Sequence, residues 1–168
     1  MKLAKILYEK ISGKKAPYYF DYSILKIITK PIRKYFTVVV APNCPFNCIR
    51  IFIYRLCGFK IGNKVFIGMK CYLDDMCYDL LTIENNVTIS YGVYFALHGK
   101  NQGHNKVTVK NGAYIGMCAR LINNKGDIVI GEDAVIGACT LVNKSIPCGA
   151  TAVGIPCRII EKEIQNDE

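Results

Sequence analysis

Residues 107–142 read VTVKNGAYIGMCARLINNKGDIVIGEDAVIGACTLV, and this stretch decides the fold. Its apolar side chains recur at intervals of six residues, at Val109, Ile115, Leu121, Ile130, Ile136 and Val142, with one interruption. A helix repeats every 3.6 residues and a half-buried strand every two, so neither template fits. An interval of six is typical of a parallel β-helix, in which each six-residue piece forms one short side of a coil.

The same interval begins at residue 61. The earlier leading positions are Ile61, Ile67, Leu73, Ile83, Ile89 and Phe95. Three six-residue pieces close one triangular coil of about 18 residues, so the sequence predicts an all-β protein, a parallel β-helix of about four hexapeptide coils. A β-sandwich with coincidental spacing is the alternative. Twelve positions in phase argue against it.

Three insertions interrupt the interval. Four residues are added after Leu73, eight after Phe95 and three after Leu121. Loops that leave a rigid scaffold commonly carry functional residues. The longest loop, residues 97–106, contains both histidines of the chain, His98 and His104.

The net charge of +9 is unevenly distributed. Residues 1–60 contain 12 basic and two acidic residues, a net charge of +10, whereas residues 61–168 contain 10 basic and 11 acidic residues, a net charge of −1. A nucleic-acid-binding core would carry its basic residues on the folded face that meets phosphate. We therefore expect no nucleic-acid partner.

The cysteine count and the start of the chain bear on the compartment. Nine cysteines would suit a disulfide scaffold only in a short secreted chain. The first 15 residues, MKLAKILYEKISGKK, lack the uninterrupted apolar core of a signal peptide. No apolar run reaches the roughly 20 residues that cross a bilayer. We expect a cytoplasmic protein with reduced thiols.

Four stretches of the chain carry a family resemblance: residues 50–62, the loop around His98, residues 136–147 and residues 153–160. In these the sequence resembles the hexapeptide acyltransferases, in particular sugar O-acetyltransferases of the galactoside/maltose type and their polysaccharide-biosynthesis relatives. The resemblance implies a left-handed coil, a homotrimer, and acetyl-CoA as co-substrate in the groove between subunits.

Acetyl transfer to a hydroxyl needs a base, and imidazole exchanges protons near neutral pH. His98 matches the catalytic histidine of the family and lies close to the coil, so we assign it as the general base. His104, among Gly and Asn residues, is expected at most to help bind substrate. The cysteines fall mostly at inward or corner positions, where a small apolar side chain is needed, so a cysteine nucleophile is disfavoured.

The resemblance also assigns the two substrate sites. It implies that CoA contacts Met117, Ala138, Asn143, Lys144 and Arg158. A further basic residue that galactoside relatives carry after the closing motif is replaced by Glu161, and Lys162 could substitute for it.

For the acceptor, the resemblance favours Asp75, with Asp74 beside it, although a solvated coil corner is an equal alternative for this pair. The asparagine that the galactoside group uses nearby is missing from residues 67–72. We therefore expect an acceptor other than a simple galactoside.

The basic first third is expected to form a partly helical segment, residues 1–60. Asn47 is predicted to cap a helix that ends at Gly58 and covers the open end of the coil. For residues 1–40, a basic amphipathic helix with nearby aromatic residues also suits contact with the inner face of an anionic membrane. The coil domain is expected at residues 61–160, with a C-terminal helix and a tail at residues 161–168.

Three classes of function remain. The favoured one is an acetyl-CoA-dependent O-acetyltransferase that acts on a sugar hydroxyl in surface polysaccharide biosynthesis. The second is a serine or amino-sugar N-acetyltransferase of the same fold, and the third is a non-catalytic β-helix. The carbonic-anhydrase version of the fold needs three histidine ligands for zinc, and the chain has two, so we expect no metal.

Overall fold

The computed structural model describes residues 2–13, 24–98, 104–122 and 126–160. The chain divides into two compact units, Met1–Tyr35 and Phe36–Glu168.

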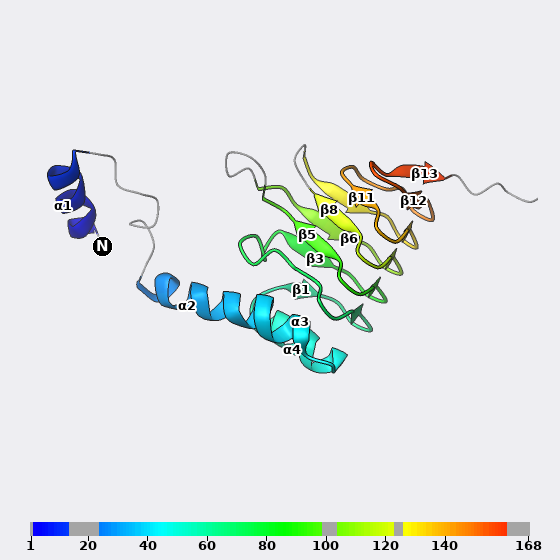
Figure 1. Cartoon of the computed structure of the whole chain (residues 1–168), viewed down its shortest axis with the longest axis horizontal. Coiled ribbons are helices and arrows are strands. Elements are labelled where there is room, and N and C mark those ends of the chain that lie inside the picture. The colour runs from blue at the N-terminus through cyan, green and yellow to red at the C-terminus, as the bar shows by residue number, and fades with distance from the viewer. Residues whose placement is uncertain (1, 14–23, 99–103, 123–125, 161–168) are drawn as a thin grey trace, which may run out of the picture. The chain divides into compact units, whose positions relative to one another are not determined.

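Within the second unit, short strands form three sheets, and consecutive strands of each coil belong to the first, second and third sheet (Figure 1). The first sheet contains β1 (Lys60–Ile61), β3 (Leu81–Ile83), β6 (Val107–Val109) and β9 (Ile128–Ile130). The second contains β2 (Phe66–Ile67), β4 (Thr88–Ile89), β7 (Tyr114–Ile115), β10 (Val135–Ile136), β12 (Thr151–Val153) and β13 (Arg158–Ile160). The third contains β5 (Tyr94–Ala96), β8 (Arg120–Ile122) and β11 (Leu141–Val142). The result is a three-sided parallel β-helix, as predicted.

The strand register reproduces the six-residue interval of the sequence. Ile89, Ile115 and Ile136 are parallel partners in successive coils, and all three are fully buried. Phe95 and Leu121 stack in the same way on the third sheet. Three coils have a strand on every sheet, and β1 and β2 begin a further, incomplete one. In each such stack, an apolar side chain packs on the equivalent side chain of the next coil. The burial of these stacks provides the main stabilisation of the coil.

The corners of the coil leave little room for side chains. A Cβ atom on Gly116 would lie 2.6 Å from the backbone nitrogen of Ala138 and 2.7 Å from the carbonyl oxygen of Ile136. Glycine is therefore required here because the backbones of successive coils approach closely.

Helix α4 (Asn47–Leu56), which follows α3 (Ala41–Asn43), packs on β1 and β2 at the end of the coil (Figure 1). The Asn47 side chain donates to the Val65 carbonyl at 3.0 Å and accepts from the Ile67 amide at 3.0 Å. The Nε atom of Arg50, whose side chain is buried, donates to the Ile67 carbonyl at 2.8 Å. These bonds satisfy backbone groups of the edge strand, which has no further coil to pair with.

The predicted capping role of Asn47 is wrong in detail. The helix begins at Asn47, its N-cap residue is Phe46, and no side chain caps it. The reason is that the Asn47 amide binds the edge strand. The predicted end of the helix is confirmed, because Cys57 is the C-cap and Gly58 follows with a φ of 97°.

The first unit contains α1 (Lys2–Ser12) and α2 (Ile24–Lys34), and the π-helical segment η2 (Tyr35–Val40) follows. Apolar side chains are exposed on both helices, Ile6, Leu7 and Ile11 on α1, and Ile28 and Ile32 on α2. Among the described residues, no helix has the length and apolar character that crossing a bilayer requires.

The described chain ends in an antiparallel pair. β13 runs against β12, with Val153 opposite Arg158. The predicted C-terminal helix is therefore absent up to Ile160, where the chain forms a strand, and residues 161–168 lie outside the described residues. β12 and β13 extend the second sheet beyond the last complete coil.

Candidate active site

All three insertions leave the coil at one corner. Each follows a position on the third sheet, namely the bridge residue Tyr72, β5 or β8, and each leads into a strand of the first sheet, β3, β6 or β9. The first loop (residues 74–80) and the second loop (residues 97–106) therefore lie in successive coils at the same corner. We call this place the insertion corner.

Asp74 connects the first loop to the second. Its side chain is fully buried, and its Oδ2 atom accepts from the amides of Leu97 at 2.9 Å and His98 at 3.3 Å. Oδ1 accepts from the amide of Met76 at 3.1 Å. A buried carboxylate is costly unless hydrogen-bond donors surround it. Asp74 thus fixes the point where the second loop leaves the coil.

The same carboxylate orients the imidazole of His98. His98 Nδ1 lies 2.5 Å from Asp74 Oδ2, and 38% of the His98 side chain is exposed. The carboxylate is an acceptor, so Nδ1 carries the proton of this bond, and we assign the tautomer on that ground. The Nε2 lone pair then remains available to accept a proton from a substrate.

A second contact joins the two loops. Cys77 Sγ lies 3.3 Å from His104 Nδ1, and the backbones of His98 and His104 form an antiparallel bridge that closes the base of the second loop. Cys77 is buried, and desolvation together with the nearby Asp74 carboxylate raises the pKa of its thiol to about 12. The thiol is therefore protonated at neutral pH and is a poor nucleophile.

Asp75 lies beside Asp74 and is also buried. It accepts a hydrogen bond from the hydroxyl of Tyr72 at 3.0 Å, and Tyr72 stacks on Tyr94 with ring centroids 4.4 Å apart. Burial raises the pKa of the Tyr72 hydroxyl, with Asp74 and Asp75 as further causes. Both carboxylates thus contribute hydrogen bonds within the protein, and their acceptor-binding role stays a prediction.

The residues assigned to CoA lie in three places. Met117 and Ala138 are exposed at the corner between the second and third sheets, where the Cys139 amide donates to the Met117 carbonyl at 2.8 Å. Asn143 and Lys144, also exposed, follow β11 and so lie at the same corner of the coil as His98, two coils further along. Arg158 is exposed on β13. Within one chain, Met117 and Ala138 lie at a different corner from His98. The contacts with CoA that are assigned to these five residues stay predictions.

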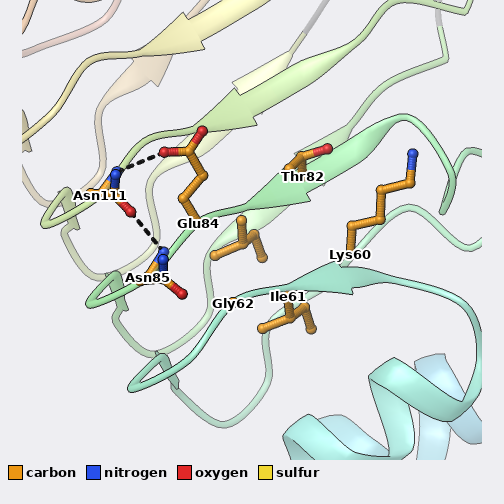
Figure 2. Close-up of a pocket in the computed structure, with 8 residues that line it drawn as sticks. Lys60, Ile61, Gly62, Thr82, Glu84, Asn85 and Asn111 are labelled. Atoms are coloured by element: carbon orange, nitrogen blue, oxygen red, sulfur yellow. Dashed lines mark hydrogen bonds between the residues drawn. The ribbon is translucent and has the colours of Figure 1, made fainter.

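A third corner, between the first and second sheets, is hollowed (Figure 2). Its lining combines apolar and polar residues, namely Lys60, Ile61, Gly62, Thr82, Ile83, Glu84, Asn85 and Asn111. Figure 2 shows Glu84 and Asn85 bonded to Asn111 of the next coil. The Asn85 amide donates to Asn111 Oδ1 at 3.1 Å, and Glu84 accepts from the Asn111 amide at 3.2 Å and from Lys110 Nζ at 2.9 Å. These groups hold neighbouring coils together, so the insertion corner is the better candidate for chemistry.

Sequence reasoning missed two features of the insertion corner. It did not identify Asp74 as the residue that orients His98, and it did not place Cys77 beside His104. The signal was present in the interval itself, because Leu73 and Phe95 occupy equivalent positions of successive coils. Loops that begin immediately after equivalent positions must leave from the same corner.

Curated proteins similar to this chain include serine acetyltransferases. The protein from Bacillus licheniformis is 36% identical over 115 residues, which is 66% of this chain and 50% of that protein. The protein from Bacillus subtilis is 36% identical over 105 residues, which is 61% of this chain and 45% of that protein. The chain thus spans about half the length of the curated relatives it matches. No protein-family model matches the sequence.

Two solved structures share the architecture. A hexapeptide-repeat acetyltransferase from Vibrio cholerae has a TM-score of 0.63 at 15% identity, covering 83% of this chain and 93% of that one. A maltose O-acetyltransferase from Clostridium difficile has a TM-score of 0.63 at 23% identity, covering 91% and 95%. These likenesses confirm the fold class, the left-handed parallel β-helix. This chain is thus similar in sequence to serine acetyltransferases over 61–66% of its length, and it shares the β-helix fold of the two solved acetyltransferases.

Proposed function

We propose that this chain is an acetyl-CoA-dependent O-acetyltransferase in which His98 is the general base. The observation that carries the proposal is the 2.5 Å contact between His98 Nδ1 and the buried Asp74 carboxylate. This contact fixes the imidazole in one orientation and leaves Nε2 as a proton acceptor at a partly exposed position. A non-catalytic β-helix would have no need to bury a carboxylate for this purpose.

The proposed reaction is a direct transfer. Nε2 of His98 takes the proton of the acceptor hydroxyl as its oxygen attacks the thioester carbonyl of acetyl-CoA. The tetrahedral intermediate collapses, the thiolate of CoA leaves, and the proton on His98 returns to it. Asp74 stabilises the imidazolium that forms between these steps, as a carboxylate does beside a catalytic histidine in other enzymes. Cys77 takes no part because its thiol is neutral.

The proposed binding of acetyl-CoA uses exposed groups. Lys144 and Arg158 are exposed cations that suit the phosphates of CoA. Met117 and Ala138 offer an exposed corner, with backbone groups and the Met117 side chain, to the pantetheine arm. Because this corner and His98 lie apart in one chain, we propose that two neighbouring subunits of a homotrimer supply the two parts of each site.

The acceptor we propose is a sugar hydroxyl in surface polysaccharide biosynthesis. The motifs around the closing segment, residues 153–160, support this choice. Serine is the second candidate, and the identity to two serine acetyltransferases favours it. Both acceptors present a hydroxyl, so the role of His98 is the same for either.

The first unit is proposed to bring the enzyme to an anionic membrane surface. Its helices expose Ile6, Leu7 and Ile11 on α1 and Ile28 and Ile32 on α2, within a segment that is rich in lysine. Burial of such side chains among lipid headgroups, with lysine near anionic lipid, is the usual basis of interfacial binding. Deletion of residues 1–40 is expected to abolish co-sedimentation with anionic vesicles. Unchanged co-sedimentation would contradict this part of the proposal.

The activity is tested by following free thiol release from acetyl-CoA with a panel of acceptors. The panel contains serine, simple sugars, oligosaccharides and an amino sugar. Acceleration by a saccharide, with an ester product that hydroxylamine cleaves, supports the proposal. Acceleration by serine alone selects the second candidate. Release that no acceptor accelerates, in a protein that binds CoA, would contradict a transferase with these acceptors.

A further inference from the structure

Side chains with metal-binding donor atoms gather at the insertion corner: Asp74, Cys77 and His98 form one group, and His104 lies beside Cys77. One ligand atom each of Asp74, Cys77 and His98 lie within 4.8 Å of one another. The fourth residue joins them through Cys77, whose Sγ is 3.3 Å from His104 Nδ1. We propose that these four side chains bind one divalent transition-metal ion of the zinc type.

The donor set selects this class of ion. Calcium and magnesium prefer oxygen ligands, whereas one thiolate, two imidazoles and one carboxylate suit zinc or cobalt. The spacing also fits, because two residues separate Asp74 from Cys77 and five separate His98 from His104. Paired ligands at such short intervals, one pair from each of two segments, are the usual pattern of a four-coordinate zinc site. The two histidines alone predict no zinc site of the three-histidine kind, whereas Asp74 and Cys77 complete a mixed donor set.

One donor separation matches a tetrahedral site, and binding would require the His104 ring to move closer to the group of Asp74, Cys77 and His98. With ligand bonds of about 2.0–2.3 Å, neighbouring donor atoms lie roughly 3.3–3.6 Å apart. The separation of 3.3 Å between Cys77 and His104 already agrees with this. The contact of 2.5 Å between Asp74 and His98 is too short, so their hydrogen bond would have to open for both to become ligands. Binding would also release the proton of the Cys77 thiol to solvent.

The surroundings would support the bound ion. The Leu97 amide donates to the same Asp74 oxygen, and the Met76 amide donates to the other one. Such outer hydrogen bonds hold a ligating carboxylate in place. The backbone bridge between His98 and His104 holds the two histidines at the base of one loop.

The consequence rests on the proposed function. An ion bound by both Asp74 and His98 would break the hydrogen bond between them. The imidazole would then lose the contact that orients it as a base. The metal-bound protein would therefore be the inactive form of the acetyltransferase.

The test uses Co²⁺ alone, added to the metal-free full-length chain in the absence of acetyl-CoA and acceptor. One equivalent of Co²⁺ is expected to bind, with a thiolate-to-cobalt charge-transfer absorption that Zn²⁺ abolishes by displacement. Cys77→Ser is expected to remove this absorption, and the matched variant Cys48→Ser, at an exposed cysteine on α4, is expected to retain it. His104→Gln, at an exposed position, should weaken binding by at least about 100-fold.

Three results would overturn the proposal. The first is a folded Cys77→Ser protein that keeps the charge-transfer absorption, and the second is a parent protein that never develops it. The third is unchanged Co²⁺ affinity in His104→Gln, which keeps the test valid if Cys77→Ser fails to fold. None of these results bears on acetyl transfer, since no substrate is present. Conversely, a chain without transferase activity could still show the cobalt absorption.

Discussion

The interior of the coil and the insertion corner are built in opposite ways. Inside the coil, Ile89, Ile115 and Ile136 stack on one another and bury only apolar surface. At the insertion corner the chain buries two carboxylates, Asp74 and Asp75, in hydrogen bonds to amides, an imidazole and a phenol. The repeat thus supplies a rigid frame, and the departures from the repeat supply the polar groups that could perform chemistry.

The largest change is expected in the catalytic rate, for a substitution at the insertion corner that leaves the stability of the coil almost unchanged. His98→Asn is expected to lower the acceptor-dependent rate of CoA release by about 10²–10⁴-fold, because the general base is lost. The melting temperature should change little, since the Asn amide can donate to Asp74 in place of the imidazole and the amides of Leu97 and residue 98 still bind that carboxylate. Thiol release in steady state and thermal unfolding provide the two measurements. A rate equal to that of the parent would remove His98 from the chemistry.

The next prediction concerns the reactivity of cysteine thiols. Cys71 lies in the coil and Cys77 at the insertion corner, and both are compared with exposed cysteines. Burial raises the pKa of Cys71 to about 11 and of Cys77 to about 12. At pH 8 the thiolate fractions of the folded protein are then about 10⁻³ and 10⁻⁴. Iodoacetamide is therefore expected to label the exposed Cys48 and Cys148 first, as read by peptide mass spectrometry.

The labelling should also depend on pH in a defined direction. The raised pKa values keep both buried thiols neutral, so their labelling should increase about tenfold for each unit of pH above 8 while the fold persists. Fast labelling of Cys77 at pH 8 would mean that its thiol is activated, and would reopen the cysteine nucleophile.

A smaller effect tests the frame itself. Ile136→Ala is expected to lower the free energy of unfolding by about 2–5 kcal/mol, because this side chain is fully buried between coils. The adjacent Val135→Ala is the matched control, since Val135 points outward and is 37% exposed. Denaturant unfolding should show a much smaller loss for the control. Equal losses would contradict the inward and outward assignment of β10.

The smallest effect concerns the covered end of the coil. Asn47→Ala removes two hydrogen bonds to the edge strand and is expected to cost about 1–3 kcal/mol of unfolding free energy. Asn63→Ala, at an exposed position, serves as the control. Chemical denaturation of both variants measures the difference. A loss no larger than that of the control would show that α4 is held by apolar packing alone.

Much of the frame could be predicted because one short interval determines it. A leading aliphatic residue every six positions leaves few other ways to bury the side chains, and the register of Ile115 with Ile136 follows from it. The prediction fails where one side chain has two possible hydrogen-bond partners. Asn47 could cap its helix or bind strand β2, and it binds the strand because that edge has no other partner.

The site could be predicted only in part. His98 stands out as one of two histidines in the longest insertion. The function of Asp74 depends on two loops meeting across successive coils, 24 residues apart in sequence. Cys77 looks like a corner residue until its neighbour His104 is placed beside it. Such pairings are tertiary, and no local pattern of the first loop reveals what the second loop will present.

A double-mutant cycle on Asp74 and His98, read as the rate of acceptor-dependent CoA release, tests whether Asp74 orients the general base. Asp74→Asn alone is expected to slow release by about 10²-fold, because an amide no longer fixes the tautomer of the imidazole. The exposed Asp79→Asn is the control and should leave the rate near that of the parent. If Asp74 acts through His98, the double variant will be no slower than His98→Asn alone. Losses that multiply in the double variant would contradict the account.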